Sequence, residues 1–191
     1  MGNVYSPTEY CKNVYYLIMT KLTLRKARFI RRPIYIRGRK SLFGGEGLTT
    51  GRHCRFDLDG TRPTLFIGNN VEMGDMTHIV AHEEVKIGNN VLIASKCFIS
   101  DTSHGVYSGE KQDSPSTLPS LRQLKTKPVI IGDNVWIGEN VVILAGAEIG
   151  NGCIIGANSI VKKKIEDNCI VVGNSRIIKQ YDTTEQCWKN I

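Results

Sequence analysis

The sequence lacks several patterns that would assign it quickly to a class. It has no apolar run approaching the roughly 20 residues that cross a bilayer, and no signal-peptide pattern at its start. Its six cysteines form no Cys-x-x-Cys pair, which disfavours a zinc ribbon and a redox motif. With 191 residues and 41% hydrophobic content, the chain is expected to form one folded domain in the cytoplasm with reduced thiols in its core.

Acidic residues are missing from residues 21–40, which contain nine lysines and arginines. This segment alone exceeds the net charge of +7, so the rest of the chain is slightly acidic. Such a run is usually a solvated face, and the alternative is a patch that meets anionic lipid head groups or a phosphorylated acceptor. No nucleic-acid-binding motif accompanies it, so we expect no nucleic-acid partner.

Residues 8–30 predict a helix, because apolar side chains recur at three- and four-residue steps beside the basic ones. Pro33 is expected to end it. The simpler interpretation is a helix packed on the end of the domain, and the alternative is an amphipathic arm on the inner face of the membrane. We therefore expect a basic helical arm over residues 1–33 and a degenerate first coil over residues 34–66. The periodic apolar positions are Val14, Tyr15, Ile18, Leu22 and Phe29.

From residue 67 a period of six residues takes over, with two interruptions. Seven of the aliphatic positions are followed three residues later by Asn or Gly, which tolerate positive φ best. Neither a helical period of 3.6 nor the alternation of a simple strand gives a spacing of six. The pattern predicts an all-β solenoid over residues 67–166, followed by a C-terminal tail over residues 167–191. The in-phase residues are Ile67, Met73, Ile79, Ile87, Ile93, Ile99, Ile131, Ile137, Ile143, Ile149, Ile155 and Val161.

Residues 105–128 interrupt the repeat with a segment rich in Ser, Pro and Gly. Because a long loop inside a compact repeat is usually functional or disordered, we predict that it is extruded and functional. His104 closes the coil that comes before it. On position alone, a histidine at such an edge is more commonly a surface residue than a catalytic one.

The motifs on both sides of this loop resemble the hexapeptide-repeat acyltransferases. IGNNVLIASKCFISDTSHG before the loop, and VWIGENVVI and GANSIV after it, are similar to the maltose, galactoside and nodulation-factor acetyltransferases. Within that branch they resemble enzymes that O-acetylate bacterial O-antigen or capsule sugars. The resemblance implies a left-handed parallel β-helix, although parallel crossovers are otherwise right-handed. It also implies a homotrimer with active sites between subunits, acetyl-CoA as co-substrate, and no metal.

The resemblance assigns a role to His104 by position, as the general base. A neutral imidazole, with an ordinary pKa near ~6.5, is able to take the proton of a sugar hydroxyl as that hydroxyl attacks a thioester. Asp101 is expected to orient the imidazole or hold the acceptor, with capping of a turn as the alternative. The family places an aromatic residue at Trp136, beside the active site and the coenzyme. Asp75 and His82 are weaker candidates for acceptor binding, because Gly74 stands where related enzymes have an acceptor-binding asparagine.

The coenzyme contacts are carried over in the same way. Besides Trp136, they include several cations, which suit a ligand with a pyrophosphate and a 3′-phosphate. The segment GNSRIIK is one residue shorter than in related enzymes and has no proline, so the register of the basic tail stays open. The positions are Glu139, Ala157, Lys162, Lys163, Arg176 and Lys179.

The resemblance thus predicts an acetyl-CoA-dependent O-acetyltransferase that acts on a sugar hydroxyl of a bacterial surface polysaccharide or its precursor. N-acetylation of an amino sugar or a nucleotide-linked sugar is the first alternative. A γ-class carbonic anhydrase, with a metal bound by three histidines, and a solenoid without catalytic activity are weaker ones. We expect the enzyme in the cytoplasm, with peripheral contact at the inner membrane as a further possibility.

Overall fold

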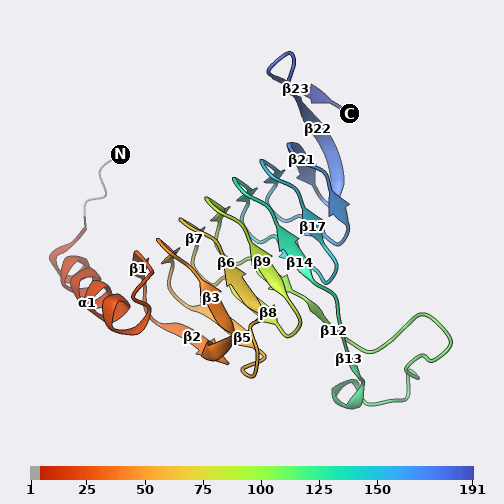
Figure 1. Cartoon of the computed structure of the whole chain (residues 1–191), viewed down its shortest axis with the longest axis horizontal. Coiled ribbons are helices and arrows are strands. Elements are labelled where there is room, and N and C mark those ends of the chain that lie inside the picture. The colour runs from red at the N-terminus through yellow and green to blue at the C-terminus, as the bar shows by residue number, and fades with distance from the viewer. Residues whose placement is uncertain (1–4) are drawn as a thin grey trace.

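The structure is a computed structural model that describes residues 5–191 and shows a three-faced parallel β-helix with one helix at its N-terminal end (Figure 1). Each coil contributes one short strand to each face. The strands of face A are β1 (Phe29–Ile30), β4 (Thr49–Thr50), β7 (Glu72–Met73), β10 (Leu92–Ile93), β15 (Trp136–Ile137), β18 (Ile154–Ile155) and β21 (Cys169–Val172).

The other two faces are built in the same way, with six parallel strands each. Face B contains β2 (Ile34–Arg37), β5 (Cys54–Leu58), β8 (His78–Ala81), β11 (Phe98–Ser100), β16 (Val142–Ile143) and β19 (Ile160–Val161). Face C contains β3 (Leu42–Gly44), β6 (Leu65–Ile67), β9 (Val85–Ile87), β14 (Val129–Ile131), β17 (Glu148–Ile149) and β20 (Lys164–Ile165). The three faces form a prism. We call the edge between faces A and B edge AB, and the edge between faces B and C edge BC.

The six-residue period sets the core. All twelve in-phase aliphatic residues are buried, and each rests on the equivalent residue of a neighbouring coil, as Ile93 does on Ile137. Burying one such side chain contributes about 1.5–3 kcal/mol. The seven Asn and Gly residues three positions further on all have positive φ, between 55° and 82°. The sequence prediction of the coil and its corners is confirmed.

The β-helix begins earlier than the six-residue pattern predicts. Residues 34–66 carry strands β2 to β5 and most of β6, so they belong to two complete coils rather than to a degenerate first one. Here Ile30, Leu48 and Phe56 fill the core without the regular spacing, because the corners differ in length. The six-residue pattern therefore does not predict these coils, although burial of apolar side chains stabilises them as it does the later ones.

Helix α1 (Pro7–Thr23) begins with a capping box at Ser6 and ends ten residues before Pro33. The prediction that it runs to residue 30 is wrong. Thr20 lies buried at its end, and the chain turns so that Ala27 and Ile30 enter the core. No helix within residues 5–191 is long and apolar enough to cross a membrane.

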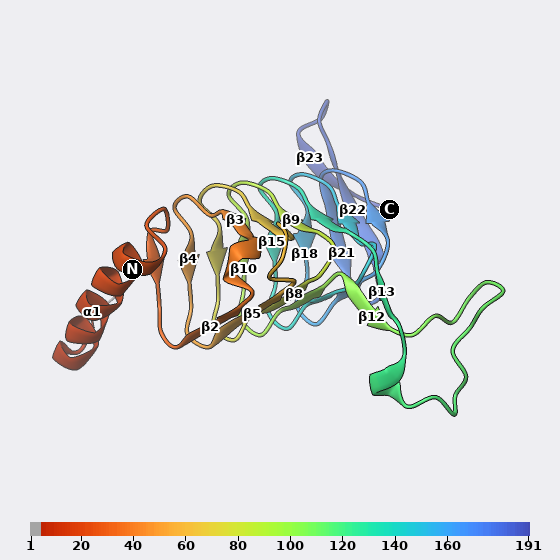
Figure 2. The same ribbon diagram turned by 60° about the horizontal axis from the view of Figure 1, so that its bottom comes forward.

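The loop leaves the solenoid at edge BC and projects away from it (Figure 2). Its base is an antiparallel pair of β12 (Thr102–His104) and β13 (Leu124–Thr126), which precede β14. The short helices η1 (Arg39–Ser41) and η2 (Pro119–Leu121) lie in the first coil and in the loop. At the C-terminal end, β22 (Arg176–Asp182) and β23 (Cys187–Asn190) extend face A as an antiparallel hairpin.

Candidate active site

His104 is exposed at the last position of β12, where the loop leaves the solenoid. Its backbone is fixed by the loop. The hydroxyl of Tyr107 donates to the carbonyl of His104 at 2.5 Å, and Arg122 Nη1 donates to that hydroxyl at 2.9 Å. Gly105 between them has a φ of 100°, and a Cβ there would lie 2.5 Å from the Tyr107 hydroxyl. Within residues 5–191 the imidazole itself has no hydrogen-bond partner, which leaves both ring nitrogens open to a substrate.

Asp101 is fully buried beneath this hairpin, and its carboxylate faces the backbone. Its two oxygens accept four hydrogen bonds of 2.6–3.1 Å from the amides of His82, Glu83 and Glu84, in the corner of the preceding coil. Its carbonyl accepts from the amide of Lys127. These contacts match the alternative role expected for Asp101, which is to cap a turn. They tie the corner that contains His82 to the coil that carries His104, so the structure brings these three residues together at edge BC.

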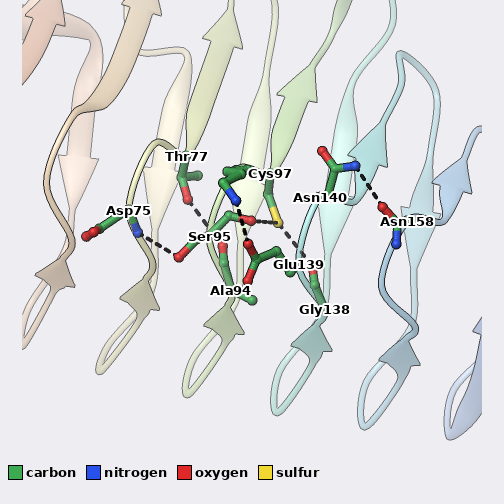
Figure 3. Close-up of polar contacts among 10 residues, drawn as sticks. Asp75, Thr77, Ala94, Ser95, Cys97, Gly138, Glu139, Asn140 and Asn158 are labelled. Carbon is green, nitrogen blue, oxygen red and sulfur yellow. Dashed lines mark hydrogen bonds and ion pairs between the residues drawn. The ribbon is translucent and has the colours of Figure 1, made fainter.

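Edge AB carries a second group of predicted residues (Figure 3). Asp75 lies in the corner after β7; its amide donates to Ser95 Oγ at 3.2 Å and its carboxylate accepts from the amide of Arg52 at 2.7 Å. Glu139 lies two coils further on and pairs with Lys96 at 3.0 Å. Ala157 occupies the equivalent corner of the next coil, directly against Gly138.

Trp136 stands on face A, at the first position of β15. Its side chain points outward between Leu92 and Ile154 of the neighbouring coils, and it is 51% exposed. Burial of a large aromatic side chain is strongly favourable, so Trp136 is suited to contact a ligand or a second subunit.

The predicted cations of the coenzyme site lie at the C-terminal end. Ser175 Oγ accepts from the amide of Lys162 and donates to the carbonyl of Ile160, which joins the corner of Lys162 to the start of β22, where Arg176 stands. Arg176 pairs with Val172 across the hairpin. None of the four predicted cations, Lys162, Lys163, Arg176 and Lys179, forms an ion pair within residues 5–191. Unpaired cations of this kind suit an anionic ligand.

The predicted residues therefore divide between two edges of the prism. His82, Asp101 and His104 lie at edge BC, whereas Asp75 and Glu139 lie at edge AB and Trp136 stands on face A. Face B separates edge BC from edge AB. A single chain does not bring the proposed base and the predicted aromatic contact together.

Two residues of this region escaped the sequence argument. Lys96, the partner of Glu139, has a φ of 60° at the corner where the next two coils have Asn140 and Asn158. That departure from the corner pattern was the available signal. Tyr107 had no signal, because its contact with His104 depends on the path of an irregular loop.

The four buried cysteines offer no obvious nucleophile. Cys54, Cys97, Cys153 and Cys169 are buried free thiols, and Cys97 donates to the carbonyl of Gly138 at 3.2 Å. Burial raises the pKa of all four thiols, to about 11 for Cys54. A buried thiol that resists deprotonation is a poor nucleophile, so none of these four thiols is suited to form an acyl-enzyme.

Comparisons with known proteins agree with this geometry. Residues 128–163 match the family model of the bacterial transferase hexapeptide, a unit of six repeats. The chain is 41% identical over 91% of its length to WbbJ of Escherichia coli K12, a candidate lipopolysaccharide biosynthesis O-acetyl transferase, and covers 89% of that protein. The chain belongs to the hexapeptide-repeat transferase family. Its β-helix is accordingly the left-handed form, as the resemblance implied.

Two further comparisons lie within the same family. The chain is 35% identical to the galactoside O-acetyltransferase of Escherichia coli K12, over 64% of this chain and 57% of that enzyme. It also superposes on a hexapeptide-repeat acetyltransferase of Vibrio cholerae, solved with acetyl coenzyme A, with a TM-score of 0.59 and 26% identity; the match covers 75% of this chain and 73% of that one.

Proposed function

We propose that this protein is an acetyl-CoA-dependent O-acetyltransferase that acts on a sugar hydroxyl of a bacterial surface polysaccharide or its precursor. The observation that carries the proposal is the family membership, with a relative named for lipopolysaccharide biosynthesis over nearly the whole chain. The open imidazole of His104 at the base of the loop supplies the chemistry such a reaction needs.

In this proposal His104 acts as the general base. A ring nitrogen takes the proton of the sugar hydroxyl while the hydroxyl oxygen attacks the thioester carbonyl. Backbone amides of a neighbouring coil are suited to stabilise the oxyanion of the tetrahedral adduct. When the adduct collapses, the carbon–sulfur bond breaks and the imidazolium returns its proton to the departing sulfur. The products are the acetyl ester and the free thiol of coenzyme A.

The co-substrate and acceptor contacts are assigned by position. Lys162, Lys163, Arg176 and Lys179 form no ion pair within residues 5–191 and would hold the phosphates of the coenzyme, with Glu139, Ala157 and Trp136 along its path. Asp75 and His82 remain candidates for the acceptor. For Asp101 the structure favours a positioning role, because both of its oxygens are engaged by backbone amides.

We further propose a homotrimer in which edge BC of one chain meets edge AB of the next. This arrangement brings His104 to Trp136, and it covers apolar side chains that are half exposed here, such as Leu92 and Ile160. Sedimentation equilibrium measures the assembly directly, and a fully active monomer would contradict it. Because acetyl-CoA is produced in the cytoplasm, we place the enzyme there.

The test of the activity is the release of coenzyme A thiol from acetyl-CoA across a panel of sugars and polysaccharides. We expect turnover with a surface-polysaccharide acceptor, and a loss of roughly 100-fold or more in kcat for His104→Ala. Lys12→Gln, at an exposed position of α1, is the control for surface changes. Wild-type turnover by His104→Ala would show that the base is wrong.

The product distinguishes O-acetylation from N-acetylation. An acetyl ester is cleaved by mild alkali or hydroxylamine, whereas an amide survives both. We expect the radiolabelled acetyl group to be released by hydroxylamine. Retention of the label would assign the amino-sugar alternative instead.

A further inference from the structure

Helix α1 carries an apolar stripe that faces away from the solenoid. Successive stripe residues are four, three, one and four positions apart and so share one side of the helix. They are 43–72% exposed, whereas the fully buried residue of α1 is polar, Thr20. We call these five residues the outer stripe: Tyr10, Val14, Leu17, Ile18 and Leu22.

Polar contacts fix this orientation. Thr20 Oγ1 accepts from the amide of Ile30 at 2.9 Å inside the core, and Arg32 Nη2 donates to Thr23 Oγ1 at 2.9 Å. Lys21 Nζ donates to the carbonyl of Ala27 at 2.8 Å. The helix is therefore anchored to the first coil through its polar side. A row of exposed apolar side chains along one side of an anchored helix is typical of an interaction site.

A cavity of about 260 Å³ lies where α1 joins the first coil. Leu24, Leu42 and Leu48 contribute its apolar lining, and the side chains of Arg25, Lys26 and Arg39 line it as well. Within residues 5–191 these three cations have no hydrogen bond or ion pair. Arg25 also borders the hollow formed by Leu17, Ile18, Lys21 and Leu22, so the cavity and a hollow of the outer stripe share this cation.

We propose that this end of the molecule docks on the surface of an anionic lipid bilayer. The cations Arg25, Lys26 and Arg39 receive lipid phosphates, while the outer stripe enters the boundary between head groups and acyl chains. Charge selects this occupant. Residues 21–40 contain nine basic side chains and no acidic one, so a second copy of the same surface would be repelled.

The docking geometry leaves the rest of the enzyme accessible. Helix α1 lies at the opposite end of the solenoid from the β22–β23 hairpin, and the extruded loop projects from the side in both views (Figures 1 and 2). A bilayer contact through α1 therefore holds the solenoid at the membrane without covering His104. The proposal stands independently of the acetyl transfer.

The experiment is co-sedimentation of the full chain with vesicles of phosphatidylcholine alone, or of phosphatidylcholine mixed with phosphatidylglycerol. We expect binding only to the mixed vesicles, weakening as salt is raised. Because each cation near such a surface adds about 1 kcal/mol, the triple variant Arg25→Gln, Lys26→Gln, Arg39→Gln should lower the partition coefficient roughly 100-fold. Ile18→Gln with Leu22→Gln should lower it roughly tenfold, with an unchanged circular dichroism spectrum.

Matched controls sit in the loop at the far side of the molecule. Leu121 is as exposed as Leu22, so Leu121→Gln controls for a lost apolar surface, and Lys111→Gln controls for a lost charge. Both should bind vesicles as the wild type does. Equal binding to neutral and anionic vesicles, or no vesicle binding at all, would overturn the proposal. So would stripe variants that lower the oligomeric mass and leave vesicle binding intact, since the stripe would then be covered by a second copy.

Discussion

At the scale of single residues, Asp101 shows how a buried charge positions a functional corner. Its carboxylate satisfies three backbone amides that would otherwise be buried without partners. Asp101→Asn puts an amide group, which is a donor, against those donors. Because hydrogen bonds to charged groups contribute about 1.5–3 kcal/mol, we expect the free energy of unfolding to fall by roughly 2 kcal/mol in urea titrations.

The control for this substitution comes from the corners between faces C and A, where a side-chain oxygen of one coil accepts from a backbone amide of the coil before it. Asp133 Oδ1 accepts from the amide of Asn89, and Asn151 makes the same bond to Asp133 from the next coil. Asparagine therefore fits that position, and Asp133→Asn should change stability by less than about 0.5 kcal/mol. Equal effects of the two substitutions would mean that the carboxylate of Asp101 is not specifically required.

Asp57 on face B predicts an acid-dependent contribution to stability. Burial alone raises the pKa of its carboxyl, but hydrogen bonds from Arg55 at 2.6 Å and His78 at 3.0 Å, with the charge of Arg37, bring that pKa below its ordinary value of 3.8. A pKa depressed in the folded state stabilises the protein above the unfolded pKa, and this contribution is lost as the pH falls through the folded pKa.

Urea titrations at several pH values check this sign. Asp57→Asn should be less stable than the wild type at neutral pH, and the gap should narrow as the pH falls below about 4. Glu46→Gln, at an exposed acid with no ion pair within residues 5–191, should track the wild type across the range. A gap between wild type and Asp57→Asn that stays constant to low pH would contradict the ion-pair account.

At the scale of elements, the β12–β13 hairpin is the device that presents His104. The Tyr107 hydroxyl bridges the His104 carbonyl and Arg122. Tyr107→Phe removes that bridge and leaves the core untouched. Because loss of alignment slows catalysis more than it weakens ground-state binding, we expect kcat to fall roughly tenfold with little change in the KM for acetyl-CoA.

Steady-state kinetics and thermal unfolding together decide this point. Tyr15→Phe, on the exposed surface of α1, is the matched control and should keep wild-type kinetics. If Tyr107→Phe lowered the melting temperature as well as kcat, the hydroxyl would be structural rather than a positioning group. An unchanged kcat would show that the hairpin holds His104 without it.

At the scale of the whole molecule, the sequence predicts the structure of the repeated coils. It does not predict contacts between segments that differ from one another. Ile137 and Asn140 occupy fixed phases of the coil, so their burial and backbone were predictable. The outward stripe of α1 was not, because a helical period gives the apolar side of a helix but not what that side meets. Likewise, the motifs that identified His104 and Trp136 do not by themselves show where in one chain the two side chains lie.

The separation of His104 and Trp136 within one chain leads to a complementation prediction for the assembled molecule. His104→Ala and Trp136→Ala should each be inactive or nearly so as pure oligomers. If each site joins edge BC of one subunit to edge AB of the next, mixed oligomers contain some interfaces with both residues intact. For random mixing in equal amounts, about a quarter of the interfaces would be restored. Activity recovered after the two variants are unfolded and refolded together, but not after simple mixing without exchange, would support the shared site. If co-refolded oligomers form and remain as inactive as the parents, each chain must use its own His104 and Trp136, and the trimer arrangement proposed here would be wrong.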